Sequence, residues 1–265
     1  MDLQKEKQEI LNTVENRQPG ADRVEITFYT DPLCCWSWAF EPQWRRLQFE
    51  YQDKLAIRNV MSGLLPSWKN YNDPMYSVSR PMQMGPVWLE ASTTSGMPIN
   101  DRIWVEDPPA SSYPACIAVK CAELQSPFAG VVYLRLLREA VMLEGKNIAH
   151  QQVLTVIAKN LESNYPGLLD IEKFVADLTN DKGIDAFRTD WQEVQNRNIN
   201  RFPTLIIRGL NKAPIMLTGY RPYTALVDAI KQISPTIEPF REAYSVDEYK
   251  QYWGSLTRRE IEEIL

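Results

Sequence analysis

Two adjacent cysteines are the side chains of this 265-residue chain that are best placed for chemistry. Cys34 and Cys35 follow Asp31-Pro32, a turn signal, and stand where a run of helical periodicity begins. A cysteine in the first turn of a helix faces unpaired backbone N–H groups and the positive end of the helix dipole, which both favour a thiolate. The sequence therefore predicts a lowered pKa for Cys34 and a thiolate that attacks disulfides. The alternative, which stays open for Cys35 above all, is a pair of small buried hydrophobic side chains.

Ser37 is the second polar side chain of this segment. It lies three residues after Cys34, on the same face of the expected helix, so its hydroxyl is expected to donate a hydrogen bond to the thiolate. Cys34 and Ser37 are thus the predicted catalytic residues. Serine cannot close a disulfide, and a bridge between the adjacent Cys34 and Cys35 would need a strained peptide. The sequence Cys-Cys-Trp-Ser predicts a monothiol site, which would form a mixed disulfide and need an external thiol for release.

The remaining cysteines and the single histidine are not predicted to be catalytic residues. Cys116 and Cys121 are five residues apart on an expected helix, about 140° around its axis, so core packing is predicted for both. His150 precedes another expected helix and is interpreted as an exposed or capping side chain. One imidazole is too few for a histidine-based metal site, and the eleven glycines form neither a GxGxxG run nor a P-loop. We therefore expect no metal and no required cofactor, with glutathione as a candidate co-substrate.

Composition and charge narrow the class of protein and its compartment. Lys and Arg total 29 against 34 Asp and Glu, a formal net charge of −5, which argues against non-specific nucleic-acid binding. No stretch approaches the ~20 apolar residues that span a bilayer, so no membrane partner is expected. The polar N-terminus does not resemble a secretory signal, and we expect a cytoplasmic protein. Thiols are normally reduced in that compartment, which favours catalytic over structural cysteines.

The elements that must position Cys34 begin with a strand, a helix and a second strand. Residues 24–29 alternate apolar and polar side chains, 34–51 have helical spacing, and 55–61 form the second strand. This order predicts a βαβ unit with parallel strands. Near the other end of the chain, residues 204–208 and 215–219 predict a hairpin, followed by a helix over 222–233.

A long insertion separates these two groups of elements. Residues 66–114 hold eight of the eighteen prolines among many aromatics, which predicts an ordered, loop-dominated segment without long helices. Helical patterns follow at 115–124, 131–143, 153–161, 171–178 and 184–194, with Asp170 as an N-cap. The predicted organisation is an N-terminal helical extension (1–22), a thioredoxin-like domain (23–64 and 199–234), an inserted loop-rich and helical domain (65–198), and a C-terminal tail with two short helices (235–265).

The cysteine motif and the predicted elements together resemble a known protein family. The run Asp31-Pro32-Leu33-Cys34-Cys35-Trp36 resembles the active-site segment of the DsbA family of thiol–disulfide oxidoreductases, in its cytosolic FrnE-like branch. The resemblance continues through residues 108–120 and 201–204 and covers most of residues 24–233. It implies an α/β, thioredoxin-like fold with a large, mostly helical insertion. It also implies a cis Pro203 beside the sulfur and a substrate-binding side formed by Cys35, Trp36, Phe202 and Pro203. Ser37 departs from the family, because it stands where the second cysteine would be.

The predicted function is therefore a cytoplasmic thiol–disulfide oxidoreductase or isomerase in which Cys34 is the nucleophile. Its substrate would be a thiol or disulfide, of a protein or of glutathione, and a homodimer is the assembly considered. Two alternatives remain open. One is a glutathione-dependent transferase or isomerase of the kappa type. The other is a non-catalytic thioredoxin-fold adaptor for a protease, which the missing second cysteine supports.

Overall fold

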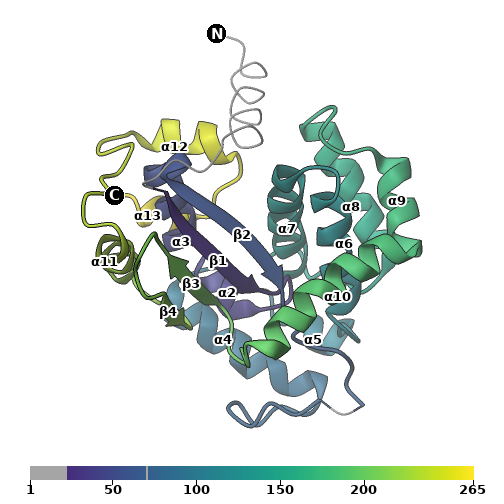
Figure 1. The fold of residues 1–265 in the computed structure, drawn as a ribbon. Coiled ribbons are helices and arrows are strands. Elements are labelled where there is room, and N and C mark those ends of the chain that lie inside the picture. The colour runs from purple at the N-terminus through teal and green to yellow at the C-terminus, as the bar shows by residue number, and fades with distance from the viewer. Residues whose placement is uncertain (1–22, 70) are drawn as a thin grey trace.

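One mixed β-sheet organises the part of the chain that the computed structural model describes, residues 23–69 and 71–265 (Figure 1). The predicted helical extension over 1–22 lies outside the described residues. The sheet order is β2-β1-β3-β4, with β1 parallel to β2 and the two other pairings antiparallel. The strands are β1 (Val24–Thr30), β2 (Leu55–Met61), β3 (Thr204–Arg208) and β4 (Ile215–Thr218). All four strands and the parallel pairing predicted from the sequence are confirmed.

The helical segment after β1 differs from the prediction. It is not one helix over 34–51 but two, α2 (Cys35–Ala39) and α3 (Glu41–Tyr51), and a short 3-10 turn, η1 (Gln52–Lys54), then leads into β2. Pro42 explains the break, because it has no N–H to donate to the carbonyl of Trp38, four residues earlier. Phe40 links the two helices as C-cap of α2 and N-cap of α3.

The proline-rich segment is more helical than predicted. It contains η2 (Pro81–Gln83), the twelve-residue helix α4 (Met84–Ser95) and the short α5 (Ile103–Glu106). The prediction of no long helix here is wrong because the prolines bracket α4 instead of interrupting it. Pro86 lies in the first turn, where its missing N–H costs no intrahelical bond. Gly96, at φ 76°, ends the helix in the left-handed conformation, and Pro98 follows.

The rest of the insertion is a group of helices beside the sheet, at the right of Figure 1. All five helices predicted there are confirmed, and Asp170 caps its helix by accepting a hydrogen bond from the N–H of Lys173 at 3.0 Å. They are α6 (Tyr113–Glu123), α7 (Pro127–Met142), α8 (Gln151–Asn164), α9 (Ile171–Thr179) and α10 (Asp181–Asn196).

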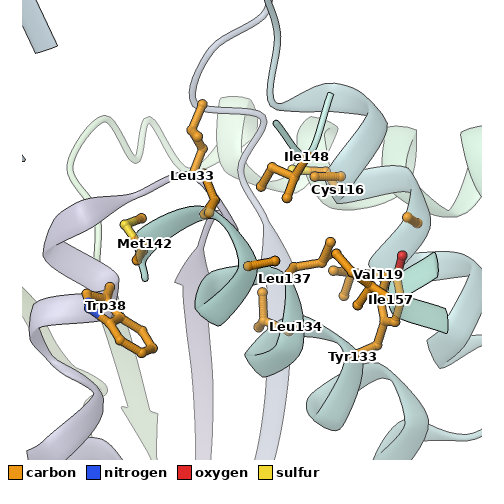
Figure 2. Close-up of a cluster of buried hydrophobic side chains, with 14 of the residues drawn as sticks. Leu33, Trp38, Cys116, Val119, Tyr133, Leu134, Leu137, Met142, Ile148 and Ile157 are labelled. Atoms are coloured by element: carbon orange, nitrogen blue, oxygen red, sulfur yellow. The ribbon is translucent and has the colours of Figure 1, made fainter. Parts of the chain in front are cut away.

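The insertion and the sheet part share one hydrophobic core. Figure 2 shows Leu33 and Trp38, from the segment after β1, beside Leu137 and Met142 of α7. These side chains belong to a single buried cluster that continues through α6 and α8. The helical part is therefore fixed to the sheet part by packing, whereas the predicted domain boundaries stay a prediction.

The C-terminal tail closes over α3. After α11 (Tyr223–Ile233), the two predicted tail helices are present as α12 (Val246–Trp253) and α13 (Arg258–Glu262). Glu260 of α13 is fully buried between Arg45 of α3, at 2.5 Å, and Arg135 of α7, at 2.9 Å. Burial works against its charge, but the two guanidinium groups outweigh burial and lower the pKa of Glu260 to about 2. The tail thus ties the sheet part to the insertion.

Candidate functional site

Cys34 lies in the connection between β1 and α2. It is the N-cap residue of α2, with φ −78° and ψ 107°. Its Sγ accepts a hydrogen bond from the backbone N–H of Ser37 at 3.4 Å. Its thiol also lies 3.7 Å from the carbonyl oxygen of Phe202, in the loop before β3. The structure therefore brings together Cys34, Ser37 and Phe202, although Cys34 and Phe202 are 168 residues apart in the sequence. Only 5% of Cys34 is exposed.

The predicted low pKa of Cys34 is wrong. Burial raises the pKa of the Cys34 thiol and outweighs the opposing hydrogen bond from the backbone N–H of Ser37, while the nearby Asp31 charge raises the pKa further. A helix terminus by itself favours a thiolate, but desolvation disfavours the charged form of a buried thiol.

Ser37 and Cys35 are also buried. The hydroxyl of Ser37 has no hydrogen-bond partner among the described residues, so the predicted contact with the sulfur is made by its backbone N–H instead. Cys35 is 3% exposed within the main hydrophobic cluster, and burial raises the pKa of its thiol well above the ordinary value. Cys35 thus has the surroundings of a small hydrophobic side chain, which was the alternative interpretation.

The expected substrate side consists of the loop before β3 and the first turn of α2. The Phe202–Pro203 peptide bond is cis, as the resemblance implied. Phe202 and Trp36 are half-buried, and the ring of Trp36 lies 6.4 Å from that of Tyr220 between centroids. The loop contacts Cys34 through the backbone carbonyl of Phe202. The roles predicted for Cys34 and Ser37 in catalysis, and for Cys35, Trp36, Phe202 and Pro203 in substrate binding, stay predictions.

Asp31 is the residue at this site that sequence reasoning missed. It is fully buried, and its carboxylate accepts hydrogen bonds from the N–H of Leu33 (2.9 Å) and of Leu64 (2.7 Å), the hydroxyl of Ser112 (2.9 Å) and the thiol of Cys116 (3.3 Å). Burial raises the pKa of Asp31, and these hydrogen bonds oppose the rise. The sequence places Asp31 in the Asp31-Pro32 turn and at the start of the segment that resembles the DsbA active site, but no spacing in the sequence indicates partners 33 to 85 residues away.

The other predicted positions follow their expected roles. Cys116 and Cys121 are buried in the core, and all four cysteines of the chain are free thiols. His150 is 59% exposed at its side chain and lies 3.6 Å from Asp107. No helix in the described part of the chain is long and apolar enough to cross a membrane. Within residues 23–69 and 71–265, no cluster of His, Cys, Asp and Glu has the arrangement of a metal site.

The sheet order, the helix that follows β1 and the cis-proline before β3 define a thioredoxin-fold protein. A family model described as Thioredoxin matches residues 28–228, and the chain belongs to the thioredoxin family. The predicted fold class, thioredoxin-like with a large, mostly helical insertion, is confirmed.

Two relatives share the name ClpXP adapter protein SpxH. The protein of Halalkalibacterium halodurans is 32% identical over 221 residues, which cover 83% of this chain and 70% of the relative. The protein of Shouchella clausii is 31% identical over 237 residues, which cover 85% of this chain and 75% of the relative.

Solved structures of other proteins have a fold similar to that of this chain. A putative protein disulfide isomerase from Nitrosomonas europaea has a TM-score of 0.64 at 21% identity, with 81% of this chain and 97% of that chain covered. A probable DsbA oxidoreductase from Streptomyces coelicolor has a TM-score of 0.61 at 12% identity, with 84% and 95% covered. At these identities the likeness shows the fold alone. The predicted resemblance to the DsbA family is confirmed at that level.

The function predicted first is wrong. A thiol–disulfide oxidoreductase or isomerase was expected from the cysteine motif, but the curated relatives that match most of this chain are named as adapter proteins. The findings agree better with the alternative of a thioredoxin-fold adaptor for a protease. The cysteine motif is a local pattern, while the burial of Cys34 involves a segment 168 residues away in the chain, which the motif does not show.

Proposed function

We propose that this protein is an adapter that binds another protein and delivers it to a protease of the ClpXP type, without redox catalysis. The names of the relatives support the delivery role. The observation that carries the non-catalytic part is the burial of Cys34, which leaves 5% of the residue exposed and raises the pKa of its thiol.

Disulfide exchange has two requirements that this site does not meet. The attacking sulfur must be an accessible thiolate, because both exposure and ionisation set the rate. A second thiol must then resolve the mixed disulfide, and position 37 holds serine, whose Oγ cannot form that bond. In the proposed adapter, Cys34 and Ser37 instead stabilise the start of α2, since the sulfur accepts the Ser37 N–H as an N-cap does.

We further infer a cytoplasmic location and no required cofactor. All four cysteines are free thiols, as expected in a reducing compartment. Delivery of a protein needs a binding surface and no bound prosthetic group, so glutathione has no part in the proposed activity. The partners are proteins, namely the protease and the protein that it degrades.

A degradation experiment tests the delivery role. In the organism that encodes this chain, protein half-lives are measured by isotope pulse-chase in the parent strain, in a strain without this gene, in one without ClpX, and in the double mutant. We expect at least one protein whose half-life lengthens severalfold in each single mutant and no further in the double mutant. Purified full-length chain should then accelerate degradation of that protein by purified ClpXP. If no ClpX-dependent protein changes its half-life, the delivery role is wrong.

A second assay tests the absence of catalysis. Purified chain is compared with its Cys34→Ser variant in reduction of insulin disulfides and removal of glutathione from a mixed disulfide. We expect neither preparation to exceed the uncatalysed rate. Turnover that is present in the parent chain and lost in Cys34→Ser would contradict a purely non-catalytic adapter.

A further inference from the structure

The two edges of the sheet differ in how they are covered. At the β2 edge, Asp190 of α10 accepts the backbone N–H of Met61 at 2.9 Å, and Glu193 pairs with Arg58 at 2.7 Å. At the β4 edge, the described residues provide no further strand beyond β4. One edge is therefore contacted by a helix of the insertion at Arg58 and Met61, and the other is open to a further strand.

The hydrogen-bond pattern shows which groups of β4 face this open edge. The N–H of Gly219 donates to the carbonyl of Pro203 at 2.7 Å, and Leu217 lies opposite Leu205 in the same register. Antiparallel pairs alternate, so the N–H and C=O groups of Met216 and Thr218 point away from β3. The carbonyl of Thr218 is not paired with β3 and accepts a hydrogen bond from Nε of Arg221 at 3.1 Å. No described residue pairs with the N–H or the C=O of Met216.

The edge is apolar along the strand and positively charged at its ends. Met216 is 55% exposed, and β4 contains no charged residue. Such an edge is a ready template for another strand. Lys212 lies in the turn before β4 and Arg221 just after it, and both are exposed. Neither forms an ion pair with an acidic residue in the described part of the chain, nor does Arg201 beside Gly219.

These charges decide what the edge can accept. Antiparallel pairing of β4 with β4 of a second copy would bring Lys212 of one chain toward Arg221 of the other, and like charges across a strand pair are unfavourable. A segment with acidic ends meets opposite charges at the same positions. The charge pattern therefore argues against self-pairing and for an acidic partner.

We propose that the β4 edge binds an extended segment of a protein partner as a fifth strand, with apolar or β-branched residues at its centre and acidic residues toward its ends. The N–H and C=O of Met216 supply the backbone hydrogen bonds, and Lys212 and Arg221 select the charge. The inference rests on the proposed function in one respect, in that the segment belongs to the protein that the adapter delivers.

A peptide titration tests the surface without any protease. The probe is a synthetic peptide with alternating valine and threonine at its centre and paired aspartates at each end, and its matched control carries lysines at those ends. The full-length chain, labelled with 15N, is titrated with each peptide at low salt while amide chemical shifts are recorded. We expect shifts centred on the Met216 amide and at least about tenfold weaker binding of the lysine peptide. Equal binding of the two peptides, or shifts remote from β4, would overturn the proposal.

Two pairs of variants separate backbone pairing from side-chain contact and from charge. Met216→Pro removes the outward N–H without removing a hydrogen bond to β3, and binding of the aspartate peptide should be lost. Met216→Thr keeps the N–H, and binding should stay within about threefold. Lys212→Glu combined with Arg221→Glu should weaken binding at least about tenfold, whereas Lys159→Glu combined with Lys173→Glu, on α8 and α9, should not. Retained binding by Met216→Pro would contradict strand addition, once circular dichroism shows that the variant is folded.

The delivery assay then distinguishes the two proposals. If Met216→Pro binds no peptide and no longer accelerates degradation, both proposals are supported. If delivery is unchanged in folded Met216→Pro, the strand-addition proposal is wrong and the adapter function stands. If the parent chain shows no delivery but binds the peptide at β4, the adapter function is wrong while the surface assignment stands.

Discussion

The thiol site and the β4 edge lie in the same thioredoxin-like part of the molecule, yet they differ in their access to solvent. Cys34 is 5% exposed and is covered by its own helix and the loop before β3, whereas Met216 is 55% exposed on an unpaired strand. The group that could react is closed, and the backbone groups that could bind are open. A redox enzyme needs the opposite arrangement at its sulfur. The difference favours a protein that recognises partners over one that exchanges disulfides.

The closed side depends on buried charges that link distant segments. Asp31 joins the end of β1 to the loop after β2 and to α6, and Glu260 joins α13 to α3 and α7. Among the described residues, no hydrogen bond or ion pair links β4 to a buried charge, and β4 pairs with β3 in the sheet. Substitutions should therefore have large effects on the closed side and small ones at the open edge.

The largest effect is expected for Asp31→Ala. This substitution leaves several buried donors without their acceptor, among them the N–H of Leu64 and the hydroxyl of Ser112. We expect a loss of about 3 to 5 kcal/mol in the free energy of unfolding, measured by urea denaturation. Asp228→Ala, at an exposed position of α11, is the matched control and should change it by less than about 0.5 kcal/mol. A small effect of Asp31→Ala would show that the closed side is held by packing alone.

The next effect concerns acid stability. The pKa of Glu260 is lowered to about 2 in the folded protein. A carboxylate with a depressed folded pKa stabilises the fold above its unfolded value, near 4.5, and this contribution is lost as pH falls from 4.5 toward 2. The loss should amount to roughly 3 kcal/mol. Chemical unfolding measured across this window should show the slope in the parent chain.

The variant Glu260→Gln should reduce that slope and also lower stability at neutral pH, because Arg45 and Arg135 lose their buried partner. Glu262→Gln, at a largely exposed ion pair with Arg258, serves as the control and should keep the slope. An unchanged slope in Glu260→Gln would mean that another carboxylate is responsible.

A smaller effect is expected in the reactivity of the Cys34 thiol. Because burial raises the pKa of Cys34, its ionisation should occur above the value of about 8.5 for a free cysteine. Thiolate absorbance is measured against pH in the parent chain and in Cys34→Ser, and the difference isolates this sulfur from the three other cysteines. Reaction with a disulfide reagent at neutral pH should be at least about tenfold slower than that of free cysteine. A midpoint below 8.5 would restore the helix-terminus argument.

The smallest effect is expected at the open edge. Met216→Thr replaces a side chain that is 55% exposed with a β-branched residue suited to a strand. The free energy of unfolding should change by less than about 0.5 kcal/mol in the same urea experiment. A loss above about 2 kcal/mol would show that Met216 packs against the chain and that the edge is not open.

Local patterns in the sequence accounted for most of the fold. The alternation over 24–29 predicts a strand and the helical spacing within 115–194 predicts helices, and the structure confirms these elements. The proline content of residues 66–114 does not predict α4, because content alone does not show where each proline lies relative to a helix end. Its Pro86 falls in the first turn, where it is tolerated.

The site was predictable in its residues but not in its electrostatics. The sequence predicts Cys34 in the first turn of a helix and, by the family resemblance, a cis bond before Pro203; the structure has Cys34 as the N-cap residue of α2 and shows the cis bond. The raised pKa of Cys34 arises from burial, and the site includes the loop at Phe202, 168 residues away, which no local pattern encodes. The same holds for Asp31, whose partners come from α6 and the loop after β2.

The most direct test of the non-catalytic account is delivery by the Cys34→Ser variant. Serine keeps an N-capping oxygen at the start of α2, so the fold should be preserved, while thiol chemistry at this position is removed. The measured quantity is the rate at which purified ClpXP degrades the delivered protein in the presence of parent or variant chain. We predict rates that agree within about twofold. A loss of acceleration in folded Cys34→Ser would contradict the account and show that the thiol itself is required.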